Sequence, residues 1–348
     1  MVTIGADSHK RSHTVVAVDP AGRKLGERTV AATPAGHLEL VRWAERWSER
    51  CWALEDCRNL SRRLEADLLR AGEQVIRVPP KLMAGARRAG RQRGKSDPID
   101  ALAVARAALR EPELPVARLD GPERELRLLV DHREDLVAER TRMQNRLRWY
   151  LHELFPGTEP APRTLGRAHV LAELDRRLEP VPGAVARLGR QLVKLICELS
   201  TSINRLEREI DALVDPLAPT LLALQGCGRL SAAKLVGETA GVARFRTRSQ
   251  YAMHNGTAPV PVWSGNDVRH RLNRGGNRQL NAAIHRIAIT QLRLGGAGCT
   301  YFERRLAAGD TKSEAIRALR RRISDDVYRR LRVDEAVRAS AGQEPVAA

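Results

Sequence analysis

The sequence predicts an α/β domain at the N-terminus followed by a mainly α-helical remainder. Short β-rich runs alternate with helical stretches as far as residue 110, and beyond this point apolar residues recur at helical spacing. The length of 348 residues, with 43% hydrophobic and 29% charged residues, fits a folded chain of two or three domains. These observations exclude a wholly disordered chain.

Five strands and two helices are expected in the first 80 residues. The first three strands form a meander, because Asp19-Pro20-Ala21-Gly22 is a strong turn signal. The order of three strands, helix, strand, helix, strand is typical of a ribonuclease-H-like α/β domain. We expect strands at residues 2–4, 14–18, 24–30, 51–54 and 74–78, and helices at residues 34–47 and 60–70.

A basic loop and a helix complete this first domain. Residues 81–96 contain six basic residues and no acidic one, which is typical both of a solvated loop and of a phosphate-binding segment. Ser96-Asp97-Pro98 then gives a helix-start signal, with proline in the first turn. The nucleic-acid contacts expected from this loop are Arg87, Arg88, Arg91, Arg93 and Lys95.

The middle of the chain predicts two long helices. The first covers residues 122–155, and a connector rich in proline and glycine follows over residues 156–185. In the second helix isoleucine and leucine alternate at heptad spacing, a pattern that favours a two-stranded coiled coil and hence a dimerisation arm. The alternative is a hairpin of the two helices within one chain. The heptad residues are Leu192, Ile196, Leu199, Ile203, Leu206, Ile210, Leu213 and Leu217.

A separate helical domain is expected after Pro219. Gly226 and Gly228 lie in a turn between two helical stretches, as in a DNA-binding helix-hairpin-helix, although any tight helix–helix turn could use them. Further helices are expected at residues 279–294 and 311–332. The predicted domains are thus residues 1–115, 116–218 and 219–335, with a frayed tail at 336–348.

Four acidic residues occupy positions suited to metal-dependent phosphoryl transfer. Asp7 follows the first strand, Glu55 ends a later strand, and Asp97 and Asp100 lie three residues apart at a helix start. Carboxylate clusters of this kind hold Mg²⁺. Each acid alone has a simpler explanation as a turn cap, a surface group or a helix-terminus charge. The nearby His9 is most simply a surface or loop histidine.

The charge balance indicates a polyanionic partner. There are 60 basic and 42 acidic residues, a net charge of +18, and only 12 aromatic residues, which argues against single-strand binding chiefly by aromatic stacking. The five cysteines are scattered and form no CxxC pair, so we expect reduced thiols. With no apolar run of 18 residues and no signal-peptide pattern, we expect a cytoplasmic protein without membrane contact.

Two groups of motifs resemble one known family. Gly5-Ala6-Asp7-Ser8-His9-Lys10, Leu54-Glu55 and Lys95-Ser96-Asp97-Pro98-Ile99-Asp100-Ala101 resemble the DEDD motif of insertion-sequence transposases with a RuvC-like N-terminal domain. Leu224-Gln225-Gly226-Cys227-Gly228, Ala243-Arg244-Phe245, Trp263-Ser264-Gly265 and the segment from Arg271 to Asn281 resemble the second domain of that family. The resemblance spans nearly the whole chain in the expected order.

This resemblance implies particular roles for these residues. Asp7, Glu55, Asp97 and Asp100 would bind Mg²⁺, and Ser264 would attack DNA to form a covalent phosphoserine intermediate. The residues alone do not select Ser264, because Ser231 and Ser249 compete equally. The chain departs from the family pattern at Trp263 and Cys227, which bears on local packing and DNA fit rather than on catalytic groups.

The resemblance also implies the partners. They are donor and target DNA, an element-encoded structured noncoding RNA that guides recombination, and further copies of the chain as dimers that pair into a tetramer. We expect Arg269, Arg271, Arg274 and Arg278 to contact nucleic acid. The alternatives are a Holliday-junction or RNase-H-like nuclease with water as nucleophile, and a non-catalytic nucleic-acid-binding scaffold; the C-terminal motifs favour the recombinase.

Overall fold

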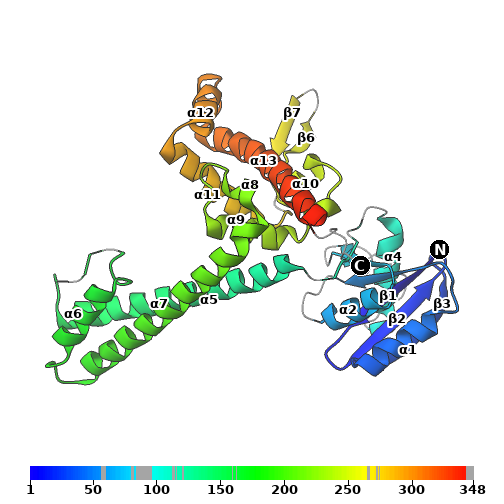
Figure 1. Cartoon of the computed structure of the whole chain (residues 1–348), viewed down its shortest axis with the longest axis horizontal. Helices are drawn as coiled ribbons and strands as arrows, with labels where there is room; N and C mark the ends of the chain where they lie inside the picture. The colour runs from blue at the N-terminus through cyan, green and yellow to red at the C-terminus, as the bar shows by residue number, and fades with distance from the viewer. Residues whose placement is uncertain are drawn as a thin grey trace, which may run out of the picture. The chain divides into compact units, whose positions relative to one another are not determined.

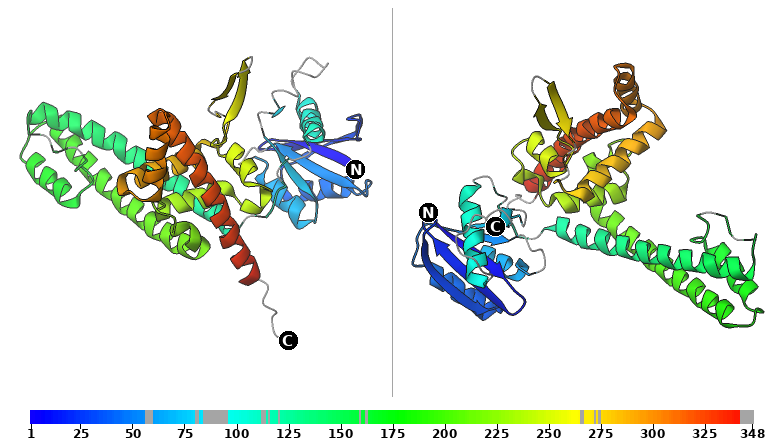
Figure 2. Two further views of the ribbon diagram at one scale, coloured as in Figure 1. Left: turned by 90° about the horizontal axis from the view of Figure 1, so that it is seen from above. Right: turned by 180° about the vertical axis from the view of Figure 1, so that it is seen from behind.

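The chain divides into two compact units, Met1–Asp120 and Gly121–Ala348 (Figures 1 and 2). The structure is a computed structural model. It describes residues 1–55, 60–79, 82–83, 96–111, 114, 116–119, 121–158, 160–161, 163–264, 267–271, 273 and 275–341.

The N-terminal unit is built on a five-stranded mixed sheet with the strand order β3-β2-β1-β4-β5. Strand β1 pairs antiparallel with β2 and parallel with β4, and β5 continues the parallel half. The predicted order of strands and helices is confirmed. The strands are β1 (Val2–Ser8), β2 (Ser12–Val18), β3 (Lys24–Ala31), β4 (Arg50–Glu55) and β5 (Val75–Val78).

Helices cover both faces of this sheet. Ile4 and Ala6 of β1 point to the face covered by α1 (Pro34–Ala44) and α2 (Arg62–Arg70), where Leu40 and Leu64 complete an apolar core. On the other face, α4 (Asp97–Arg110) packs its alanines against residues such as Val16. Because successive strand residues alternate between faces, β2 and β4 contribute to both layers.

Two long antiparallel helices form the arm of the second unit: α5 (Pro122–Leu154) and α7 (Ala184–Leu217), with the short helix α6 (Ala168–Leu178) at one end (Figure 1). The predicted connector of residues 156–185 joins the two long helices and also contains α6, because Leu171, Leu174 and Leu178 pack into the apolar end of the arm and stabilise a helix there.

Most heptad residues of α7 are packed within one chain. Ile196 packs near Leu147 of α5, and Ile210 packs near Leu126. The guanidinium of Arg133 on α5 also donates to Glu207 of α7, with Nε 2.8 Å from Oε1. The intrachain hairpin is therefore the arrangement observed. A dimer contact remains a prediction and needs another face of the arm.

The C-terminal part of the second unit is a helical bundle around one apolar core that also includes the base of the arm. The turn at Gly226 follows a first helix of only four residues, so a helix-hairpin-helix remains a prediction. Its elements are α8 (Pro219–Leu222), α9 (Arg229–Thr239), the 3₁₀ helix η1 (Val242–Arg244), α10 (Arg248–His254), α11 (Arg278–Leu294), α12 (Ala297–Ala307) and α13 (Lys312–Ala341).

Two features of this bundle differ from the sequence prediction. Helix α13 continues to Ala341, so the predicted tail from residue 336 starts too early. A two-stranded hairpin of β6 (Val260–Ser264) and β7 (Asp267–Arg271) precedes α11, where no strands were expected. In the described part of the chain, every helix is too short or too polar to cross a bilayer.

Candidate metal centre

The packing of α4 on β1 depends on Gly5. A Cβ atom at this position would lie 2.3 Å from the carbonyl oxygen of Ala101 and 2.4 Å from the backbone nitrogen of Ala105. Asp7 follows Gly5 on the same face of the strand, and Asp97 lies one helical turn before Ala101. The close approach that glycine permits therefore brings Asp7 beside the first turn of α4.

Asp7 is a buried carboxylate in an acidic neighbourhood. Its exposed fraction is 7%. Burial raises the pKa of Asp7 above its ordinary value of 3.8, and His9 partly offsets this rise. The carboxylates of Asp100 and Asp97 raise the pKa of Asp7 further. A group of carboxylates that destabilise one another's charge is the electrostatic environment that a divalent cation relieves.

His9 lies between the two nearest carboxylates. Its Nε2 is 3.0 Å from Oδ2 of Asp7 and 3.3 Å from Oδ1 of Asp97. The His9 backbone nitrogen donates to the carbonyl of Ser12 at 3.0 Å, which fixes this residue at the start of the β1–β2 turn. The prediction of a simple surface or loop histidine was incomplete. The one available signal was the two-residue spacing, which keeps His9 close to Asp7 just after the end of β1.

The register of the parallel strands β1 and β4 places Glu55 at the same edge of the sheet as Asp7. Ala6 pairs with Leu54 in the parallel β1–β4 ladder, so Asp7 and Glu55 each follow that pair by one residue. Asp100 is buried in the first turn of α4 and acts electrostatically on Asp7. The structure thus gathers Asp7, Asp97 and Asp100, and it places Glu55 at the carboxyl end of the neighbouring strand.

The residues of this cluster fit a divalent metal. Among the described residues, Asp7, His9 and Asp97 each offer a ligand atom, and these atoms all lie within 4.8 Å of one another. Carboxylate oxygens suit Mg²⁺ and Mn²⁺, and an imidazole nitrogen suits Mn²⁺ better than Mg²⁺. Asp7 supplies a buried charge, whereas the His9 and Asp97 side chains are each 49% exposed, which leaves the cluster open to substrate.

Two family models match the chain. A model for DEDD transposases of the IS110 type matches residues 4–156, and a model described as "Transposase IS116/IS110/IS902 family" matches residues 218–303. The insertion element IS110 43.6 kDa protein of Streptomyces coelicolor is 30% identical, with 66% of this chain and 69% of the relative covered. The chain belongs to the IS110 family of transposases.

Other relatives match this transposase over almost its full length. The insertion element IS116 44.8 kDa protein of Streptomyces clavuligerus is 28% identical, covering 95% of this chain and 94% of the relative. The insertion element IS900 42 kDa protein of Mycobacterium paratuberculosis is also 28% identical, covering 97% and 96%. Among solved structures, T. thermophilus RuvC in complex with a Holliday junction substrate matches 32% of the transposase and 94% of RuvC, with 17% identity and a TM-score of 0.25.

The predicted nucleophile of the transposase lies within the second matched region, residues 218–303. Ser264 is the last residue of β6, and its backbone pairs with that of Asp267 at the start of β7. Only the backbone of Ser264 is described, and residues 265 and 266 lie outside the described residues. The serine therefore lies at the end of β6, directly before these residues.

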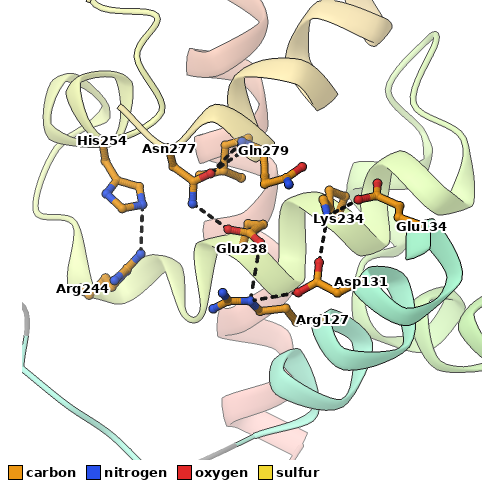
Figure 3. A network of polar contacts seen from close by, with 10 residues as sticks. Arg127, Asp131, Glu134, Lys234, Glu238, Arg244, His254, Asn277 and Gln279 are labelled. Atoms are coloured by element: carbon orange, nitrogen blue, oxygen red, sulfur yellow. Dashed lines mark hydrogen bonds and ion pairs between the residues drawn. The ribbon is translucent and has the colours of Figure 1, made fainter. Parts of the chain in front are cut away.

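A polar network joins α5 to α9 of the transposase (Figure 3). Lys234 of α9 is 1% exposed, and its Nζ donates to Asp131 at 2.9 Å and to Glu134 at 2.8 Å, both on α5. Burial lowers the pKa of Lys234, but these two carboxylates outweigh burial and hold the pKa above its ordinary value. The network therefore keeps a buried positive charge between the two helices.

The same network reaches the helix that follows the hairpin. Glu238 of α9 accepts a hydrogen bond from Nδ2 of Asn277 at 2.6 Å and lies 3.5 Å from Nε of Arg127. Asn277 caps α11, because its Oδ1 accepts from the backbone nitrogens of Gln279 and Leu280. Figure 3 shows Glu238 between these partners. The start of α11 is thereby fixed to α9 and, through Arg127, to the arm.

The structure describes some of the predicted nucleic-acid contacts and not others. Gly226 has a positive φ of 84° and packs against α11, where a Cβ would lie 3.1 Å from the carbonyl oxygen of Ile287, so packing alone explains this glycine. Gly228 has open space around it. Arg278 begins α11 and is exposed. Arg269 and Arg271 lie on β7 and are described only at their backbone, while Arg87, Arg88, Arg91, Arg93, Lys95 and Arg274 lie outside the described residues.

Proposed function

We propose that this transposase cuts and rejoins DNA with a divalent metal, Mg²⁺ in the cell, held by Asp7, Glu55, Asp97 and Asp100. The observation that supports this most is the convergence of Asp7 and Asp97 around His9 at the end of β1. The DEDD transposase model covers the same residues. Because His9 offers a nitrogen at the same point, we include it in the proposed ligand set.

The metal would neutralise charge that develops on the phosphate oxygens during phosphoryl transfer. Asp7 provides a buried carboxylate whose position is fixed by strand β1. Asp97 and Asp100 lie three residues apart in the first turn of α4, so both carboxylates lie on one face of the helix. His9 is fixed by its backbone hydrogen bond to Ser12 and so holds its ring between Asp7 and Asp97.

In our proposal Ser264 is the nucleophile. Its Oγ attacks the scissile phosphorus, the bond from phosphorus to the leaving deoxyribose oxygen breaks, the serine proton passes to solvent, and the leaving oxygen takes up a proton. One phosphodiester replaces another, so the energy needed for rejoining is kept in the protein–DNA bond. The reverse attack by a deoxyribose hydroxyl releases Ser264 and joins the new strand.

We further propose that an element-encoded noncoding RNA selects the donor and target duplexes. Base pairing would then read sequence, while the protein reads backbone shape and charge. The net charge of +18 supports contacts with both nucleic acids. Exchange between two duplexes needs several active sites, so we propose dimers that pair into a tetramer.

The decisive experiment is a covalent-adduct assay. The full-length transposase, Mg²⁺, guide RNA and labelled matching DNA are incubated, and protein-linked DNA is separated by denaturing electrophoresis. We expect an adduct with the wild-type protein and with Ser249→Ala, the control for serine loss, but none with Ser264→Ala. An adduct that survives Ser264→Ala contradicts the serine assignment, and released DNA ends without any adduct indicate a nuclease that uses water.

A second assay separates the metal site from the nucleophile. Asp7→Asn and Asp97→Asn should abolish recombination, whereas Asp19→Asn, which changes an acid of the β2–β3 turn, should retain it. Undiminished recombination by Asp7→Asn would remove the metal-site proposal.

A further inference from the structure

A groove of about 1470 Å³ runs along α13, bordered by α12 and by the turn after α8. Its floor is fixed by two glutamines: Gln291 of α11 donates to the carbonyl of Gln225 at 2.8 Å, and Gln225 donates to the carbonyl of Gly295 at 3.1 Å. Gly295 and Gly296 have positive φ angles of 77° and 91°, a conformation that favours glycine, and they join α11 to α12 beside the groove.

The walls of this groove carry an excess of positive charge. Its two acids are already engaged, because Asp326 accepts from Arg329 and Arg330, and Asp325 pairs with Arg321 outside the groove. Among the described residues, no carboxylate pairs with the other four arginines. Those four are Arg248, Arg304, Arg322 and Arg332.

An aromatic ring orders two of these free guanidinium groups. Cζ of Arg322 lies 4.6 Å from the ring centroid of Tyr301, and Cζ of Arg304 lies 5.3 Å from it. Guanidinium groups stacked on an aromatic ring keep their N–H groups available for bidentate contacts with phosphate. Tyr301 therefore presents two charges at one end of the groove without neutralising them.

The spacing of the arginines fits a polymer rather than a small anion. Arg322, Arg329 and Arg332 lie on one face of α13, and ten residues of helix span about 15 Å. Measured along the axis of a duplex, this length corresponds to about four phosphates of one strand. The groove is also larger than a small-molecule pocket, which is typically about 300–1,000 Å³.

We propose that this groove binds the phosphodiester backbone of a nucleic-acid strand, with Arg304, Arg322 and Arg332 as phosphate contacts. The inference rests on the proposed function in that the strand belongs either to the DNA substrate or to the guide RNA. Both have the same backbone chemistry, so the test uses both.

The test measures the salt dependence of binding to the full-length protein. Fluorescence anisotropy is recorded with a labelled DNA duplex and with a single-stranded RNA of equal length and arbitrary sequence. The groove variant is Arg304→Gln, Arg322→Gln, Arg332→Gln. The control variant, with the same loss of charge, is Arg142→Gln, Arg146→Gln, Arg187→Gln, which changes exposed arginines of the arm.

For the strand that occupies the groove, we expect the slope of log K against log salt to flatten by about 2.7 with duplex DNA or about 2.1 with single-stranded RNA. The control variant should change that slope by less than half as much. The nucleic acid whose slope flattens is the occupant. Equal slopes for the groove and control variants, at unchanged melting temperature, would overturn the groove assignment.

The adduct assay keeps this inference separate from the proposed function. If the groove variant binds as the wild type does while the wild type still forms the Ser264 adduct, the groove proposal alone fails. If the wild type binds neither nucleic acid, the proposed function fails with it.

Discussion

The α hydrogens of Gly5 face the backbone of Ala101, so closely that a Cβ atom on Gly5 would lie 2.3 Å from the Ala101 carbonyl oxygen. This contact determines how near α4 approaches β1, and with it the distance between Asp7 and Asp97. A position without a side chain is thus a structural requirement of the acidic cluster.

Gly5→Ala should damage both stability and activity. The added methyl group forces α4 away from the sheet, and we expect the free energy of unfolding to fall by about 1–3 kcal/mol. We also expect loss of recombination, because the acidic cluster depends on this approach. Urea unfolding followed by circular dichroism measures the first effect. Gly228→Ala is the control for the stability measurement alone, because nothing lies within 4 Å of its Cβ position and its φ is −77°. Equal stability of Gly5→Ala and wild type would contradict the packing argument.

Asp7→Asn should stabilise the metal-free protein at neutral pH. Because burial raises the pKa of Asp7, the folded protein retains a proton that the unfolded chain releases above pH 3.8, so ionisation of Asp7 costs stability at pH 7. The gain in melting temperature should shrink as the pH falls toward 3.8. Thermal melts with EDTA between about pH 4.5 and 7.5 measure it.

The half-exposed Asp97 provides the comparison for that experiment. Asp97→Asn should change the melting temperature less than Asp7→Asn does. Added Mn²⁺ should raise the melting temperature of the wild type, because a ligand of the folded state stabilises it, and should raise that of Asp7→Asn much less. A lower melting temperature for Asp7→Asn at pH 7 without metal would show that the carboxylate is stabilising there.

His9 should be visible spectroscopically as a metal ligand. With Mn²⁺ as the probe, electron spin-echo envelope modulation should show coupling to an imidazole nitrogen in the wild type and in His169→Ala, an exposed histidine of α6. The coupling should be absent in His9→Ala. The affinity of His9→Ala for Mn²⁺ should also fall more than its affinity for Mg²⁺, since a nitrogen ligand favours Mn²⁺ over Mg²⁺. No nitrogen coupling in the wild type would reduce His9 to a hydrogen-bond partner of Asp7.

Lys234 should contribute to the attachment of α9 to the arm. Lys234→Ala removes a buried cation that bridges the partly exposed Asp131 and Glu134, and we expect a loss of about 1–3 kcal/mol in the free energy of unfolding. Lys234→Met keeps the aliphatic stem and should cost less. Denaturant melts of the three proteins should therefore rank wild type, Met and Ala in decreasing stability. Indistinguishable melts would mean that the ion pairs contribute nothing net.

The N-terminal domain was predictable because its signals are local. Alternating apolar residues in β1 and β2, the Asp19-Pro20 turn and the Ser96-Asp97-Pro98 helix start are each contained in a few neighbouring residues. The acids Asp7, Asp97 and Asp100 could be selected for the same reason, since they adjoin the ends of those elements.

The remaining features depend on contacts between distant segments. Helix α13 extends past residue 336 because Asp334 accepts from the backbone nitrogens of Thr220 and Leu221, and Glu335 accepts from those of η1. These partners are about a hundred residues away in the chain, so a local sequence pattern cannot predict these contacts. His9 was undervalued likewise, because its position between Asp7 and Asp97 follows from the packing of α4.

The core of the second unit has a consequence for synthesis on the ribosome. It combines Leu126 of α5 with Ile323 and Leu331 of α13, so its first and last contributors are translated far apart in time. The N-terminal unit contains its own apolar core and can fold as soon as it emerges. The C-terminal bundle instead stays incomplete until α13 has been translated, so a chain that stops before α13 contains the acidic cluster but lacks part of the core of the second unit.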